Sequence, residues 1–173
     1  RELGKFLKEG SLYRGFKPVL WSTVEKTALA DAEVEYQDHK SDTIYTSFLV
    51  KSSDLKELND CEIIIWTTTP WTIPANKALA YNKNLIYLIL HLQDNNEFKN
   101  RKIVIAKDLL ESVIKDCKIE NFKILKEISG KEFSGTICKH PFFEIGYQYD
   151  VPMLDARFVT LEQGTGFVHC APS

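Results

Sequence analysis

No stretch of this sequence is long and apolar enough to cross a membrane. None of the apolar runs in the 173 residues approaches the roughly 20 residues that a membrane-spanning helix needs. Charges occur throughout the first ten residues, so the sequence does not open with the apolar core of a signal peptide. We therefore expect neither a membrane protein nor a membrane partner.

An excess of positive charge is also missing. The chain has 22 Lys and Arg against 24 Asp and Glu, a formal net charge of −2. Modules that hold nucleic acid mainly by neutralising phosphates are usually strongly basic. Because the lysines are interleaved with acidic residues, they are typical of a solvated surface. Any contact with RNA should therefore be local.

Cysteine pairs and metal-ligand spacings are absent. The four cysteines are Cys61, Cys117, Cys138 and Cys170. None forms a Cys-x-x-Cys pair, and two lie in apolar runs where a free thiol behaves as a small hydrophobic side chain. The four histidines show no ligand spacing with one another or with the cysteines. These features predict a reduced, cytoplasmic protein without a metal site.

What is present suits one folded domain. The sequence is 44% hydrophobic and 27% charged, and its length allows a real core. It has no initiator Met and stops directly after a motif, which favours a piece excised from a longer protein.

Hydrophobic periodicity predicts many short strands and few helices. Helical spacing occurs at residues 1–9 and 106–115. Strand patterns occur at residues 19–21, 43–50, 61–65, 85–92, 102–106, 122–128, 136–138, 151–154 and 156–159, with a hairpin turn at 94–96. This alternation predicts an α+β domain built on a barrel-like, mainly antiparallel sheet with a few packed helices.

The organising stretch is residues 66–76, Trp-Thr-Thr-Thr-Pro-Trp-Thr-Ile-Pro-Ala-Asn. It follows an apolar, β-branched run, and Pro70 and Pro74 force the chain out of the sheet into a stiff, turned loop. Hydroxyl groups and indoles are thereby presented near a strand end, and threonine offers a donor, an acceptor and a methyl group. The simpler interpretation is that the threonines end a strand and the tryptophans fill the core.

Three segments resemble the editing domain of isoleucyl-tRNA synthetase, the insertion that hydrolyses wrongly charged tRNA. They are the threonine-rich stretch at 67–76, the Gly-Thr-Gly-Phe-Val-His-Cys-Ala-Pro run at 164–172, and Trp21 followed by residues 27–36. Related valyl and leucyl enzymes have Arg at the position of Thr69 and an acidic residue at that of Trp71, so the isoleucyl type is favoured. The resemblance implies a single editing domain over 1–173, with 1–42 as the connecting segment and 43–173 as the editing core.

The resemblance implies hydrolysis of the ester that joins misactivated valine to the acceptor end of tRNA(Ile), with valyl-adenylate as a further candidate substrate. Its partners would be that tRNA end, the valine and the rest of the synthetase chain. Editing would need no cofactor, whereas ATP and Mg would serve the synthetic domain of the whole enzyme. The alternatives are a non-catalytic module that positions the acceptor end, or the editing domain of a valyl or leucyl enzyme.

The sequence contains no nucleophile elbow, so water is the expected nucleophile. The resemblance assigns catalytic roles to Thr68, Thr69 and His169, where His169 would bound the pocket and hydrogen-bond the ribose or the acyl group. The expected substrate-binding residues are Trp66, Thr67, Asn76, Gly164, Thr165 and Gly166.

The family places an ammonium-binding aspartate within about ten residues of its His-x-Ala-Pro motif. The present sequence ends before that position, and Asp150 and Asp155 are not expected to replace it. Weak binding or slow turnover by this chain is therefore expected.

Overall fold

The computed structural model describes residues 1–38, 40–93 and 100–172, so the predicted hairpin turn at 94–96 lies outside the described residues. The chain divides into two compact units, Arg1–Lys40 and Ser41–Ser173. The first contains helix α1 (Glu2–Lys8), the hairpin of β1 (Trp21–Ser22) and β2 (Thr27–Ala28), and the 3-10 turn η1 (Asp31–Glu33). The predicted helix at 1–9 is confirmed. None of the described residues of this unit is buried.

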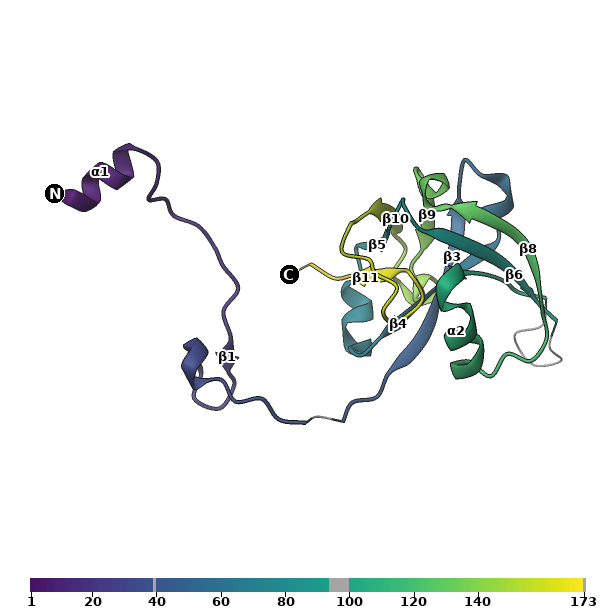
Figure 1. Cartoon of the computed structure of the whole chain (residues 1–173), viewed down its shortest axis with the longest axis horizontal. Helices are drawn as coiled ribbons and strands as arrows, with labels where there is room; N and C mark the ends of the chain where they lie inside the picture. The colour runs from purple at the N-terminus through teal and green to yellow at the C-terminus, as the bar shows by residue number, and fades with distance from the viewer. Residues whose placement is uncertain (39, 94–99, 173) are drawn as a thin grey trace. The chain divides into compact units, whose positions relative to one another are not determined.

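The second unit contains one sheet of nine strands (Figure 1). They are β3 (Ile44–Ser52), β4 (Cys61–Thr67), β5 (Ala78–Tyr81), β6 (Ile86–Leu92), β7 (Lys102–Ala106), β8 (Phe122–Ser129), β9 (Ile137–Lys139), β10 (Asp150–Asp155) and β11 (Val168–Cys170). The strand order is β11-β5-β10-β9-β3-β4-β7-β6-β8. Only the β5–β10 and β4–β7 pairs are parallel among the described residues.

Short helical elements connect the strands. They are η2 (Lys56–Leu58), η3 (Pro70–Ala75), η4 (Lys107–Leu109), α2 (Leu110–Asp116), η5 (Gly130–Phe133) and η6 (Phe143–Ile145). The predicted helix at 106–115 therefore begins as a 3-10 turn and continues as α2. The predicted loop after Pro70 is a 3-10 segment, whose tight winding tolerates proline at its first position.

The predicted α+β class with a mainly antiparallel sheet is confirmed, but the sheet does not close into a barrel. Within the described part of the chain, β11 and β8 form its two edges. The predicted strand at 156–159 is wrong, because β10 ends at Asp155 and the chain then turns. The hydrophobic residues there do not alternate between two faces of a strand. Val159 is buried, whereas the neighbouring Phe158 is exposed.

The core lies along the inner face of this sheet. In β4, Cys61, Ile63 and Ile65 are buried and alternate with half-buried residues, as a strand with one face on the core requires. The register of β3 with β4 places Phe48 opposite Ile63. The same inward alternation leaves Thr67 as the last buried residue of β4, and the threonine-rich stretch therefore starts at the edge of the core.

Candidate functional site

A cavity of about 330 Å³ lies where the end of β4 meets the segment that precedes β11. One wall comes from residues 66–69 and the other from residues 158–169. The lining residues are Trp66, Thr67, Thr68, Thr69, Phe158, Val159, Thr160, Gln163, Gly164, Gly166, Phe167, Val168 and His169. Two segments about a hundred positions apart in the sequence therefore share one cavity, and neither contributes an Asp, Glu, Lys or Arg to it.

The threonines differ in how their hydroxyl groups are used. Thr67 is buried, and its Oγ1 accepts from the amide of Thr69 at 3.1 Å and lies 3.3 Å from the hydroxyl of Thr69. Thr68 is exposed, and its hydroxyl has no hydrogen-bond partner within the described residues. Thr67 therefore fixes the turn, and Thr68 is left to bind a water or a ligand.

The 3-10 segment η3 is anchored from the protein interior. His140 is buried and its Nε2 lies 2.8 Å from the carbonyl oxygen of Ile73, to which it donates, since its Nδ1 accepts from the amide of Phe142 at 3.1 Å. The hydroxyl of Tyr149 donates to the carbonyl oxygen of Asn76 at 2.8 Å. These contacts hold the segment that carries the threonines.

His169 is fixed at both ring nitrogens. Its Nε2 lies 2.9 Å from Oγ1 of Thr72, and its Nδ1 lies 2.8 Å from the side-chain amide nitrogen of Asn76. Burial, with a smaller contribution from His140, lowers the pKa of His169 below its ordinary value, so the ring is neutral at pH 7. A neutral ring with two protein partners acts as a fixed wall of the cavity.

The Gly-Thr-Gly run is held in place by a backbone hydrogen bond to its middle residue. The amide of Ala106 donates to the carbonyl oxygen of Thr165 at 2.8 Å, and the side chain of Thr165 is fully buried. Gly164 faces the indole of Trp66, where an added Cβ would lie 3.8 Å from Cε3. Gly166 has φ +82°, in the left-handed region that glycine adopts most readily.

Seven of the nine residues expected at the site line this cavity, and two lie behind it. Asn76 and Thr165 are fully buried and do not line the cavity, although Asn76 contacts His169 directly. The sequence predicted the Thr72 hydroxyl near the strand end but assigned it no role, and it missed His140 and Tyr149. Thr72 belongs to the same threonine-rich stretch, whereas His140 and Tyr149 carry no local signal.

Asp150 and Asp155 are paired elsewhere. Asp150 forms an ion pair with Lys51 at 2.6 Å, and Asp155 forms one with Lys83 at 2.8 Å. Neither lines the cavity. As expected, they do not offer a carboxylate to an ammonium group at this site.

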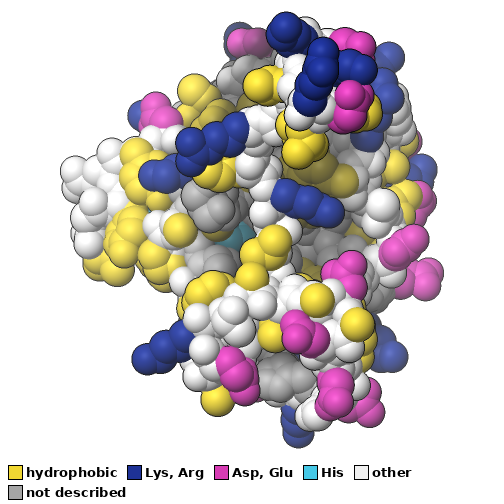
Figure 2. All heavy atoms as spheres, turned by 90° about the vertical axis from the view of Figure 1, so that its left-hand side faces the viewer, with side chains coloured by type: hydrophobic (Ala, Val, Ile, Leu, Met, Phe, Trp, Pro, Cys, Tyr) yellow, Lys and Arg dark blue, Asp and Glu magenta, His cyan; other side chains and the backbone are white. Residues whose placement is uncertain are grey.

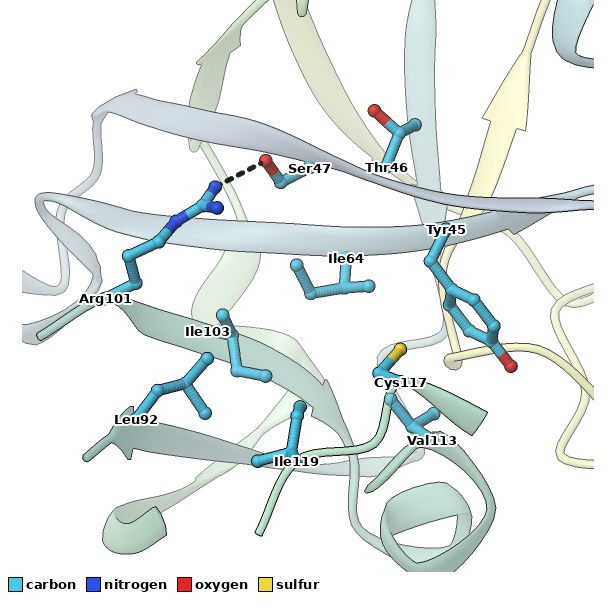
Figure 3. A pocket seen from close by; sticks show the side chains of 10 residues that line it. All are labelled: Tyr45, Thr46, Ser47, Ile64, Leu92, Arg101, Ile103, Val113, Cys117 and Ile119. Atoms are coloured by element: carbon cyan, nitrogen blue, oxygen red, sulfur yellow. Dashed lines mark hydrogen bonds between the residues drawn. The ribbon is translucent and has the colours of Figure 1, made fainter. Parts of the chain in front are cut away.

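A larger cavity of about 410 Å³ lies beside β3, β4 and α2 (Figure 3). Ile64, Ile103 and Ile119 point toward this space. Three of its polar side chains are paired, because Arg101 binds Glu62 and Ser47 and the hydroxyl of Tyr45 donates to Asp116. Burial raises the pKa of Cys117, which keeps its thiol protonated and unreactive. This cavity is apolar and offers no catalytic groups.

Three further observations concern surface charge, metal ligands and membrane spans. On the face drawn in Figure 2, side chains of Lys and Arg and side chains of Asp and Glu both occur. No cluster of three or more His, Cys, Asp or Glu able to hold a metal ion occurs among the described residues. None of the helices in the described ranges could span a membrane.

Comparison with known proteins decides the family. Residues 1–139 match the family described as tRNA synthetases class I (I, L, M and V). The chain belongs to this class I aminoacyl-tRNA synthetase family. It is 75% identical over all 173 residues to the isoleucine--tRNA ligase of Pelagibacter ubique, and 47% identical over 178 aligned positions to that of Gluconobacter oxydans. The chain spans 19% and 18% of the lengths of these two synthetases.

The fold is that of class I synthetase editing domains. The chain resembles the editing domain of the cytosolic leucyl-tRNA synthetase of P. knowlesi with a TM-score of 0.56 at 14% identity, covering 75% of this chain and 56% of that one. It resembles the structure titled GlLeuRS-CP1 with a TM-score of 0.54 at 13% identity, covering 74% of this chain and 54% of that one. At such low identity the likeness shows the fold alone.

Proposed function

We propose that this chain is the editing module of an isoleucyl-tRNA synthetase and hydrolyses the ester of mischarged valyl-tRNA(Ile). One observation carries the proposal. Thr67, Thr68 and Thr69 share a single cavity with His169, although the two motifs are far apart in the sequence. The synthetase family and the editing-domain fold agree with it.

The cavity suits attack by water on an ester. The free hydroxyl of Thr68 and the half-buried hydroxyl of Thr69 can orient a water molecule beside the scissile carbonyl. Uncharged hydroxyl and amide dipoles in a preorganised site can stabilise the developing oxyanion without a metal. The reaction therefore needs no cofactor in this module, and ATP and Mg belong to the synthetic step of the whole enzyme.

Substrate selection rests on shape. Trp66 on one wall and His169 on the other offer apolar surface and no charge, which fits the side chain of valine. Both ring nitrogens of His169 already have protein partners, so His169 is better suited to limit the size of the acyl group than to accept a proton. The acceptor end of the tRNA would enter from the exposed rim near Phe158 and Thr160.

The test uses the complete synthetase that contains this chain, with hydrolysis of valyl-tRNA(Ile) measured as release of free valine. Thr68→Val together with Thr69→Val should abolish most of the hydrolysis and leave the charging of isoleucine intact. Thr46→Val is the matched control, because Thr46 lines the other cavity. If the wild-type enzyme binds valyl-tRNA through this module and releases no valine, a module that only positions the acceptor end is the correct description.

A further inference from the structure

Asn82 and Tyr87 hydrogen-bond to one another and to the cavity wall. The hydroxyl of Tyr87 accepts from the backbone amide of Asn82 at 3.0 Å and donates to the carbonyl oxygen of Gly166 at 3.0 Å. The side-chain amide of Asn82 donates to the carbonyl oxygen of Val159 at 3.0 Å. Val159 and Gly166 both line the proposed editing cavity, so this pair holds two points of one wall.

The wall needs such contacts because residues 159–167 form no regular structure. They connect β10 to β11 through consecutive bends and have no strand partner. An irregular backbone keeps one shape only where its polar groups are satisfied by fixed partners. Besides the bond from Ala106 to Thr165, the hydrogen bonds from Asn82 and Tyr87 are the ones that join this segment to the residues beneath it in the described structure.

Both members of the pair are themselves rigid. Tyr87 is fully buried in β6, and its ring lies 4.9 Å from that of Phe133 and 4.7 Å from that of Phe167. Burial raises the pKa of Tyr87 to about 12, so the hydroxyl keeps its proton and remains a donor. The Oδ1 of Asn82 accepts from the amide of Asn84 at 3.0 Å, which fixes the orientation of the side chain.

We propose that Asn82 and Tyr87 are positioning residues of the editing site, which hold the segment 159–166 at its working distance from the threonines. The inference rests on the proposed function. Neither residue lines the cavity, so neither touches the substrate. They determine the fraction of molecules in which the segment 159–166 lies at its working distance from the threonines. A lower fraction weakens apparent binding in proportion and leaves the bound complex unchanged.

The first test measures the wall directly in the complete synthetase, by hydrogen exchange of the amides in residues 159–167. Tyr87→Phe removes one hydroxyl and keeps the ring in the core, and it should speed exchange of this segment by about 10-fold. Tyr45→Phe is the matched control, since it removes a tyrosine hydroxyl that donates to Asp116 at the other cavity. Equal exchange of the segment in the two variants would overturn the proposal.

The second test separates positioning from general destabilisation. Tyr87→Phe should raise KM for valyl-tRNA(Ile) hydrolysis by about 10-fold with kcat changed by less than about twofold, whereas Tyr45→Phe changes neither. Asn82→Asp should act in the same direction, because it keeps the acceptor for Asn84 and faces the carbonyl of Val159 with an oxygen. Unchanged KM in both variants would overturn the proposal.

The two proposals fail in different ways. If the wild-type synthetase does not hydrolyse valyl-tRNA(Ile), the proposed function is wrong, while the exchange experiment still reports whether Asn82 and Tyr87 hold the wall. If the wild-type enzyme hydrolyses it and both variants match Tyr45→Phe in exchange and KM, the positioning role alone is wrong.

Discussion

The side-chain nitrogen of Asn76 lies 2.8 Å from Nδ1 of His169 and 3.0 Å from the carbonyl oxygen of Ala78. An amide nitrogen can only donate, so Nδ1 is the acceptor and Nε2 carries the proton of the neutral ring. Nε2 then donates to Thr72, whose hydroxyl donates to the carbonyl oxygen of Thr69 at 2.7 Å. One chain of hydrogen bonds thus links the two motifs and sets the tautomer of His169.

Removal of the Thr72 hydroxyl should disturb this chain without changing the volume of the side chain. Thr72→Val leaves Nε2 of His169 without its acceptor and should reduce valyl-tRNA(Ile) hydrolysis by about threefold. The unpaired ring nitrogen should also cost about 1 kcal/mol of the free energy of unfolding. Steady-state hydrolysis and urea unfolding measure the two effects. Thr46→Val is the control, and equal behaviour of the two variants would contradict the role of Thr72.

The lowered pKa of His169 predicts a loss of stability on acidification. In the unfolded chain this histidine binds a proton as the pH falls through about 6.5, whereas the folded chain resists protonation because the ring is half-buried. The unfolded state therefore binds more protons between the folded and unfolded pKa values, and the free energy of unfolding decreases there as the pH falls. Above the unfolded pKa this contribution is constant.

Urea unfolding at pH 7.5 and pH 5.5 checks this expectation. The wild-type chain should lose more stability between the two values than His169→Gln, which has a donor and an acceptor but does not titrate. The same loss in both proteins would show that His169 is not the group responsible.

Gly166 should be the least replaceable glycine of the site. A Cβ at this position would lie 2.3 Å from Cβ of Ala106, and the φ of +82° disfavours any L side chain. Gly166→Ala should therefore lower the free energy of unfolding by about 3 kcal/mol, from overpacking and backbone strain together. Gly146→Ala is the control, since its φ is +112° but no atom lies within 4 Å of the added Cβ. A loss no greater than that of the control would contradict the close approach.

The parts of the fold set by local pattern were predictable from the sequence. The alternation of β4 and the helical spacing of α2 each bury one face, whereas the long apolar run of β6 is buried on both faces. Each of the three elements was confirmed within a few residues. The point where the threonine-rich stretch leaves the sheet also followed from local chemistry, because its two prolines cannot continue a central strand.

The supports of the site depend on contacts that no local pattern reveals. In the sequence Tyr87 looks like one more apolar residue of a buried strand, yet its hydroxyl donates to Gly166, 79 positions further along the chain. His140 likewise reaches Ile73, and Asn82 reaches Val159. The error at 156–159 has a similar cause, since Val159 is buried by a turn and a bond from Asn82 instead of by a strand partner.

The geometry of His169 leads to the most informative prediction, which separates a steric wall from a chemical participant. One extra methylene is worth about 1 to 3 kcal/mol in an apolar enzyme pocket. A wall can therefore spare the cognate product by displacing its ester from the attacking water. His169→Ala in the complete synthetase should make isoleucyl-tRNA(Ile) a substrate while hydrolysis of valyl-tRNA(Ile) falls by less than about 10-fold. Separate deacylation rates for the two tRNAs measure this. A parallel collapse of both rates by several orders of magnitude would show that the ring takes part in the chemistry, despite the two protein partners that occupy its nitrogens.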